Sequence, residues 1–355
     1  MNHGQLLDRI LHGEPVRGLD LSAFDLAGAD LAGGIFESVR FPTSMRRASL
    51  KESTFASCDF TGCDLQEADF HLAALYRCRL DEARLDGAHL VATGFMECEA
   101  HATSFARVHA QIATWSTADL DRASFAGANL DRANFLDASC SETDFRGANL
   151  EKATLYRADL RTADLTGANL VLTTLVEAKL GAKKFQEARL FRTQFMRSDL
   201  AGADFSGVDC SQSNFMAADL TGASFARAKG HQAFFGEAKL DGANLSNADF
   251  KQAVFERASL AGADLSGSIF EESVFTRVIA TGARFHRAKL TYADFSRADL
   301  TGADFTDAAL FRAKFHRVNR DDAVIPRFGG WLGDDEDLAR VEEWKPKHGA
   351  EPSRD

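Results

Sequence analysis

Large apolar residues recur at every fifth position from Leu50 to Phe315, without a change of register. Of the 54 positions on this grid, 47 are Leu or Phe. The exceptions are Ala100, Ala110, Trp115, Cys140, Cys210, Gly230 and Ala280. Two residues before each grid position stands Ala, Ser, Thr, Cys or Val, with Lys183 the one departure. A five-residue period of this length determines the fold almost by itself.

The period excludes ordinary helices and flat strands. On an α-helix, steps of five residues advance by roughly 140° and would spread the large side chains around the axis. On a flat strand, an odd step alternates faces, so half of the large residues would point at water. The chain must therefore turn a corner every five residues and close into stacked coils, which bury one continuous apolar column.

The pattern resembles the pentapeptide repeat family, whose motif is Ala, Asp or Asn, Leu or Phe, and two variable residues. Examples are Ala-Asn-Leu-Asp-Arg at 128–132 and Ala-Asp-Phe-Ser-Gly at 203–207. The resemblance implies an all-β fold, a right-handed parallel quadrilateral β-helix with four pentapeptides per coil. Residues i and i+20 then lie above one another, and about fifteen coils at roughly 4.8 Å give a rod on the order of 70 Å long. Family members perform unrelated functions, so the resemblance predicts fold rather than activity.

The two ends of the chain differ from the repeats. Residues 5–12 place Leu6, Leu7, Ile10 and Leu11 at helical spacing. Residues 334–344 predict a second helix, whose Leu338, Val341 and Trp344 could close the last coil together with Phe328 and Trp331. Such caps protect the open ends of solenoids, and the C-terminal end is also a candidate homodimer contact. We expect an N-terminal capping helix (1–18), a β-helix (19–320), a C-terminal cap (321–344) and a disordered tail (345–355).

Several irregularities interrupt the grid. Phe41 and Leu50 are nine residues apart rather than ten, which predicts an irregular corner near Pro42. Ala100 and Ala110 leave space that Trp115 could fill, and Gly230 vacates another core position, so a cavity or a bend is expected at each place. Cys58, Cys78 and Cys98 stand 20 apart at Cα spacing that a disulfide could tolerate. Burial as reduced thiols is the favoured interpretation.

Outward-facing positions are read as lines of period 20, and one line is apolar over five coils. It comprises Leu136, Tyr156, Val176, Met196 and Met216, while Val171 and Phe191 form a shorter pair on another side. A contiguous stripe of roughly 20 Å is typical of interaction surfaces. The alternative is corner packing against the adjacent turn.

Charged residues follow the next position along the same side. Asp137, Arg157, Glu177 and Arg197 alternate in sign and predict exposed ion pairs. Farther along the line, Arg257, Arg277, Arg297 and Arg317 are all basic. Such a strip is either well hydrated or a site for an anionic partner.

Nothing in the sequence predicts catalysis, a cofactor or a metal. The ten histidines are dispersed, and no phosphate loop, nucleophile elbow or Cys-x-x-Cys motif occurs. The recurring Asp and Asn suit corners, where short polar side chains bond to the backbone. No apolar run approaches the ~20 residues of a transmembrane helix, and no secretory apolar segment opens the chain. We therefore expect a non-enzymatic cytoplasmic protein without a membrane span.

Three functional hypotheses follow. The first is a rigid scaffold that binds a protein partner. The second is a DNA mimic that binds DNA gyrase or topoisomerase, as some relatives do; of the net charge of −11, however, residues 319–355 contribute −4, which leaves −7 on the rest. The third refines the first, because residues 6–21 resemble pentapeptide proteins that accompany bacterial type VI secretion systems. Direct nucleic-acid binding is not expected, since the basic strip lacks interleaved exposed aromatics.

Overall fold

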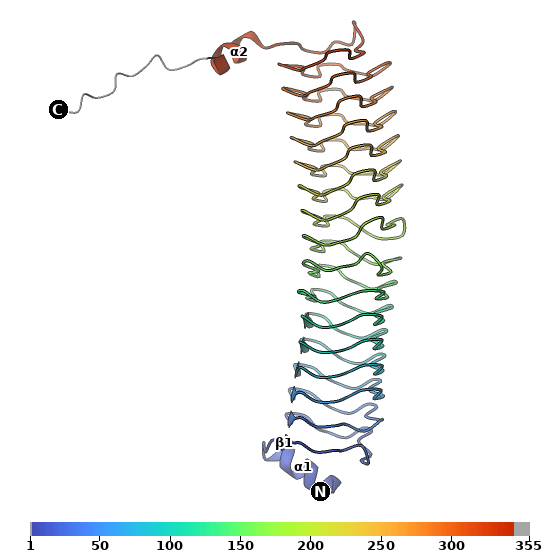
Figure 1. Cartoon of the computed structure of the whole chain (residues 1–355), viewed down its shortest axis with the longest axis vertical. Helices are drawn as coiled ribbons and strands as arrows, with labels where there is room; N and C mark the ends of the chain where they lie inside the picture. The colour runs from blue at the N-terminus through green and yellow to red at the C-terminus, as the bar shows by residue number, and fades with distance from the viewer. Residues whose placement is uncertain (1, 344–355) are drawn as a thin grey trace, which may run out of the picture.

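A computed structural model describes residues 2–343 as a long parallel β-solenoid with a helix at each end (Figure 1). One unbroken ladder of 15 parallel bridges runs from Asp20 to Asn319, each joining a coil to the next. Most bridges pair residue i with residue i+20. Four pentapeptides therefore form each coil, and the chain is the right-handed quadrilateral β-helix that the family resemblance implies.

The first coils carry short strands on one side. These are β1 (Val16–Arg17), β2 (Ile35–Glu37), β3 (Thr54–Ala56), β4 (Ala74–Tyr76), β5 (Gly94–Met96) and β6 (Thr114–Ser116), which pair in order as one parallel sheet. Single bridges continue this row of pairs from Thr114 to Lys314. We call this side, which contains grid positions 115, 135 and so on to 315, the Phe-rich side.

One coil near the N-terminus is short by one residue. Phe36 pairs with Phe55, a separation of 19, whereas Ser44 pairs with Asp64, a separation of 20. The deletion lies between the buried Phe41 and Met45, and Pro42 is buried in this corner. The irregular corner thus lies where the spacing predicts it.

Most corners are hydrogen-bonded turns. The amide of Ala128 donates to the carbonyl of Phe125 (3.0 Å), and Gly127 between them has a φ of +64°. Non-glycine residues adopt the same left-handed conformation at equivalent corners, as at Arg132 (φ 57°), because a type II turn requires a positive φ at its third residue. The Asp and Asn before the grid residue close the turn from the other side: Asp64 accepts from the amide of Gln66 (3.1 Å). Their abundance therefore serves structure.

The core is a column of stacked rings and aliphatic chains. Phe215 stacks on Phe235 (4.8 Å between centroids) and meets Phe225 edge-on. Trp115 stacks between Phe95 (5.3 Å) and Phe135 (4.9 Å), and its buried Nε1 has no hydrogen-bond partner among the described residues.

The structure has no cavity at Gly230, contrary to the expectation of a cavity or a bend there. A Cβ at this position would lie 2.0 Å from the ring of Phe250, so that ring occupies the space that the missing side chain leaves. The large residue of the next coil compensates for the small one, which keeps the column filled.

Lys183 produces a local defect in the ladder. Its Nζ donates to the carbonyls of Ala163 (2.5 Å) and Arg161 (3.0 Å), in the region where the bridge between positions 164 and 184 is missing from the described coils. Burial lowers the pKa of this lysine, although nearby Asp164 opposes the shift. The ammonium group thus satisfies carbonyls of the preceding coil.

All six cysteines are free and buried. The thiols of Cys78 and Cys98 donate to the carbonyls of Phe55 and Leu75 (both 3.5 Å). Burial and, to a lesser extent, the charge of Asp64 raise the pKa of Cys63 to about 12.

Helix α1 (His3–Leu11) closes the first coil. Asn2 and Gln5 form a reciprocal capping box, with both hydrogen bonds 2.9 Å long. Leu6 and Ile10 are buried in the core, whereas Leu11 is exposed. The apolar face of this helix is therefore narrower than the sequence suggests.

The expected apolar closure of the C-terminal end is wrong in most of its residues. Phe328 is fully exposed, and Leu338 and Val341 of α2 (Glu336–Glu343) are also exposed, because α2 buries no residue and lies beside the last coils. Only Trp331 is packed: its ring lies 5.4 Å from Phe315, and its Nε1 donates to the carbonyl of Pro326. Trp344 and the expected tail at 345–355 lie outside the described residues.

Leu165→Asp should unfold the rod locally, since it places an unpaired charge in the apolar column. We expect a loss of more than about 3 kcal/mol in the free energy of unfolding, measured by urea titration followed by circular dichroism. Thr166→Asp, at the adjacent exposed corner, is the control. Equal stability of the two variants would contradict the inward orientation of Leu165.

The buried thiols should be unreactive in the folded protein, because a thiol with a pKa of about 12, such as Cys63, is almost entirely protonated at pH 8. Ellman's reagent should label six thiols in urea and far fewer than one per chain within minutes without it. Rapid labelling of the native protein would place at least one cysteine at the surface.

Candidate protein-interaction surface

The predicted apolar line exists as one continuous feature at a corner of the Phe-rich side. Bridges from Asn134 through Thr154, Thr174 and Gln194 to Asn214 hold five successive coils in the i/i+20 register. The members of the line, two residues farther along in each coil, are Leu136, Tyr156, Val176, Met196 and Met216. Leu136 is exposed and the other four are half-buried, so part of each side chain is covered by its neighbours.

The line is longer than the five residues singled out from the sequence. Tyr76 and Met96 stand on it at the same spacing of 20 and are exposed, with Ser116 between them and Leu136. The signal was present in the sequence, since both positions follow from counting back from Leu136.

The line also extends one coil beyond Met216, by a route that the sequence does not reveal. Gly236 occupies the next position, and a Cβ there would lie 2.6 Å from the ring of Phe234. The Phe234 ring therefore covers the glycine and replaces the missing apolar side chain. A small cavity of about 60 Å³ lies here, lined by Met216, Phe234 and the side chains of Glu237, Glu256 and Arg257. We call the line from Tyr76 to Phe234 the apolar stripe.

Charged residues beside the stripe form part of the expected ladder. Glu177 accepts from Arg157 (3.1 Å) and lies 3.6 Å from Arg197. The hydrogen bond from Arg157 lowers the pKa of Glu177 and keeps it ionised. The Arg157 guanidinium also lies 4.7 Å from the centre of the Tyr156 ring, and the Tyr156 hydroxyl donates to Glu177 (3.3 Å). These contacts fix the orientation of Tyr156 on the stripe.

The four arginines farther along the line do not form a uniform basic strip. Arg257 lies 3.6 Å from Glu237 and 4.0 Å from Glu256. Arg277 forms no ion pair within residues 2–343. Arg297 and Arg317 are occupied by carboxylates of α2. We keep the name arginine strip for Arg257, Arg277, Arg297 and Arg317.

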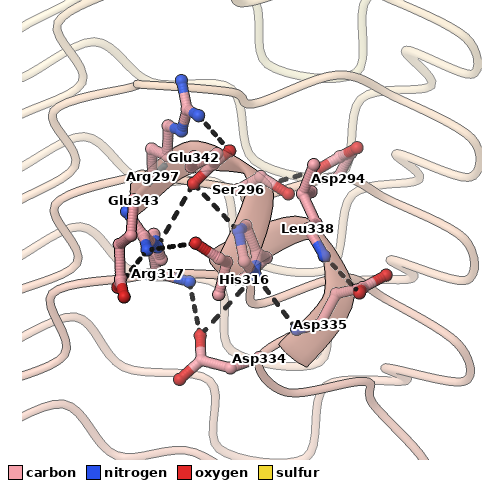
Figure 2. Close-up of polar contacts among 11 residues, drawn as sticks. Asp294, Ser296, Arg297, His316, Arg317, Asp334, Asp335, Leu338, Glu342 and Glu343 are labelled. Carbon is pink, nitrogen blue, oxygen red and sulfur yellow. Dashed lines mark hydrogen bonds and ion pairs between the residues drawn. The ribbon is translucent and has the colours of Figure 1, made fainter. Parts of the chain in front are cut away.

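Helix α2 lies over the last coils on the Phe-rich side and is held by polar contacts (Figure 2). Glu342 forms ion pairs with Arg297 and with Arg317 (3.2 Å to Nε), while Glu343 accepts from Arg317 Nη2 (2.6 Å). Arg317 Nη2 also donates to the carbonyl of Ala339 (3.1 Å). Two arginines of the strip thus bind the C-terminal turn of a helix from the same chain.

His316 lies beneath this helix and is almost fully buried. Its Nδ1 accepts from the amide of Asp335 (3.0 Å), so Nε2 carries the proton and faces Glu342 Oε2 (3.4 Å). Burial raises the pKa of the Glu342 carboxyl, but the hydrogen bonds from Arg297 and His316 outweigh it, and the net shift is downward. The repeat pattern does not predict this contact: His316 stands at an outward repeat position, and α2, which covers it, lies outside the repeats.

The contact surface of α2 is almost entirely polar. No residue of the helix is buried, and a cleft of about 340 Å³ between helix and rod is lined by Leu338, Thr276, Arg277 and other residues of both elements. An eight-residue helix is not stable alone in water, and exposed ion pairs stabilise weakly and are screened by salt. The helix is therefore weakly held in its position.

Val171 and Phe191 lie on a different corner and are not brought together with the stripe. Arg192 lies 5.3 Å from the Phe191 ring and begins a line of hydrogen-bonded side chains. This line runs through Gln212, Gln232 and Gln252 to Glu272, with distances of 2.6 to 3.2 Å. It borders a polar groove of about 520 Å³. The side chains of this line therefore use their hydrogen-bonding groups on one another.

Among residues 2–343, no three or more His, Cys, Asp or Glu side chains are grouped so that they could hold a metal ion. His89 and His109 stack at 5.1 Å, as their spacing of 20 predicts. Neither described helix is long and apolar enough to cross a bilayer.

Comparison with known proteins identifies the repeat. A family model described as pentapeptide repeats (8 copies) matches residues 43–81, 53–90, 116–151, 143–181 and 193–229. A second model, the pentapeptide repeat region, matches residues 248–325. Together they cover more than half of the chain. A search of curated proteins finds no match.

Solved structures of pentapeptide repeat proteins are also similar. HetL from Nostoc sp. strain PCC 7120, a protein involved in regulating heterocyst differentiation, is 25% identical over 88% of this chain and 96% of its own, with a TM-score of 0.21. The plasmid-mediated fluoroquinolone resistance protein QnrB1 is 18% identical over 48% of this chain and 98% of its own, with a TM-score of 0.31. The family models cover most of the repeats, and the coils have the 20-residue register of four pentapeptides. The chain therefore belongs to the pentapeptide repeat family.

Proposed function

We propose that this protein is a non-enzymatic rigid scaffold that binds a protein partner through the apolar stripe. The observation that carries this proposal is the length of the stripe: apolar side chains occupy the same corner from Tyr76 to Phe234, interrupted once at Ser116. At roughly 4.8 Å per coil, this is a line on the order of 40 Å. Isolated exposed apolar residues are ordinary, whereas contiguous ones are typical of interaction sites.

The composition of the stripe suits an interface. Tyr and Met are enriched in the centres of protein interfaces, and two tyrosines and three methionines stand on the line. The contacts of Tyr156 with Arg157 and Glu177 hold its ring before any partner arrives. Pre-oriented side chains lose less conformational entropy on binding, so a rigid rod favours affinity here.

The alternative function, a DNA mimic that binds DNA gyrase or topoisomerase, requires a dense negative surface. Along the corner that carries the stripe, Arg157, Arg197 and Arg257 are interleaved with the acids that they bind. Such a neutralised surface would compete poorly with DNA for a basic groove. These charges favour the scaffold over the mimic.

An association with a type VI secretion system would supply the class of partner, and it rests on the resemblance of residues 6–21 alone. In the fold, this segment forms α1 and β1 and buries Leu6, Ile10 and Val16 against the first coil. These side chains have a structural role that any pentapeptide solenoid could share. The identity of a captured partner would decide the matter.

The Val176→Glu, Met196→Glu double variant should lose the partner without unfolding. Each glutamate adds a charge to the centre of the stripe at a half-buried corner that can expose it to water. We expect at least about a tenfold loss of partner recovered by affinity capture from the native host, with an unchanged circular dichroism spectrum.

The matched control is Thr166→Glu with Gln186→Glu, which adds the same two charges at exposed positions of the opposite corner. If control and stripe variants recover the same proteins in the same amounts, the stripe is not the binding surface. Loss of the native spectrum in the stripe variant alone would assign Val176 and Met196 to the core.

Self-association through the C-terminal end is a separate prediction. Phe328 is fully exposed there, and Val324 and Leu332 are more than two-fifths exposed beside it. If this end is a homodimer contact, Phe328→Asp should shift the protein from dimer to monomer in sedimentation equilibrium, while the stripe variant should not. A monomeric wild type at 100 µM (about a hundred times a 1 µM Kd) would refute this contact.

A further inference from the structure

The position of α2 indicates what kind of partner fits this corner. The row of bridges that supports the stripe continues without interruption through Phe234, Val254, Val274 and Asp294 to Lys314. The stripe and the arginine strip therefore occupy adjacent positions of one corner, the stripe on the earlier coils and the strip on the last coils, where α2 docks. In Figure 1, α2 and the strands β3 to β6 lie on the same side of the rod.

We propose that the arginine strip is a docking site for an acidic amphipathic helix of a protein partner, and that α2 is a weak occupant that such a helix displaces. This inference rests on the proposed scaffold function and names the chemistry of the partner. The same chain thus supplies both the site and an example of its ligand.

The chemistry of α2 supports this assignment. Its carboxylates at Glu342 and Glu343 take Arg297 and Arg317, which would otherwise repel one another as stacked cations. The helix covers only two of the four arginines, and Arg277 is left without an ion pair in the described residues. The charge of the strip is only partly compensated by its own chain.

The apolar side of the contact is also incomplete. Leu338 faces the cleft beside Thr276 and Arg277 but is still exposed, and Val341 is largely exposed. A longer helix with acids at the same spacing could pair with Arg277 as well and reach Phe234 and Met216, which border the next cavity. It would bury apolar surface that α2 leaves in water, and would bind more tightly for that reason.

The test uses the full chain and a synthetic helical peptide of about 20 residues with Glu on one side and Leu on the other, a length of about 30 Å. Its dissociation constant is measured by fluorescence anisotropy. Glu342→Lys with Glu343→Lys should release α2 by repulsion from Arg297 and Arg317, verified as faster amide hydrogen exchange over residues 336–343. We expect this variant to bind the peptide about tenfold more tightly, because the competitor is gone.

Arg277→Glu should weaken peptide binding about tenfold or more, since it replaces the unpaired cation of the strip with a repelling charge. Arg227→Glu is the matched control: it has the same charge change at the same turn position (φ 58°) on another corner. No binding to the α2-released variant at millimolar peptide, or equal losses in both arginine variants, would overturn the proposal.

The two proposals fail separately. If Val176→Glu, Met196→Glu abolishes partner capture while Arg277→Glu changes neither capture nor peptide binding, the scaffold stands and the acidic-helix site falls. If the peptide behaves as expected but the stripe variant captures every partner normally, the stripe is refuted and the arginine strip stands by itself.

Discussion

Everything on this molecule depends on the hydrogen bonds between successive coils. The amide of Leu150 donates to the carbonyl of Asn169 (2.9 Å), and that of Asn149 donates to Ala128 on the coil before (2.9 Å). Because such pairs recur at every side of the rod, each coil is placed over the last at a separation of 20 residues. Corner residues therefore stand in straight lines along the rod. A charged or apolar surface that extends over several coils requires residues of the same type at a spacing of 20 in the sequence.

This constraint explains why the fold could be predicted and where prediction failed. The five-residue period specifies the corners and the core, the family resemblance supplies the register of 20 residues, and even the single missing residue near Pro42 could be placed. That the Phe250 ring fills the space at Gly230 could not be predicted. The period gives the position of each Cβ, but not the rotamer that the side chain adopts. Lys183 is similar: its position is inward, but its long chain reaches carbonyls of the preceding coil.

The candidate surface was predictable to the same degree. The line through Tyr156 and Met196 follows from counting by 20, and Tyr76 and Met96 could have been found in the same way. Phe234 could not, since it reaches the line from a neighbouring position. The docking of α2 could not be predicted either, for a different reason. Helical spacing predicted an apolar face at Leu338 and Val341, but the contacts that place the helix are ion pairs and a histidine of the last repeat that the helix buries.

At the arginine strip, the ion pairs that stabilise the last coils also determine which partner can bind. Arg277, Arg297 and Arg317 stand one coil apart and repel one another, and the carboxylates of α2 offset this repulsion at Arg297 and Arg317. A partner that displaced α2 without bringing negative charge would restore that repulsion and gain little. Only an acidic partner can take the place of the helix and keep the strip compensated. The arginines that hold α2 against the last coils thereby restrict this site to acidic partners.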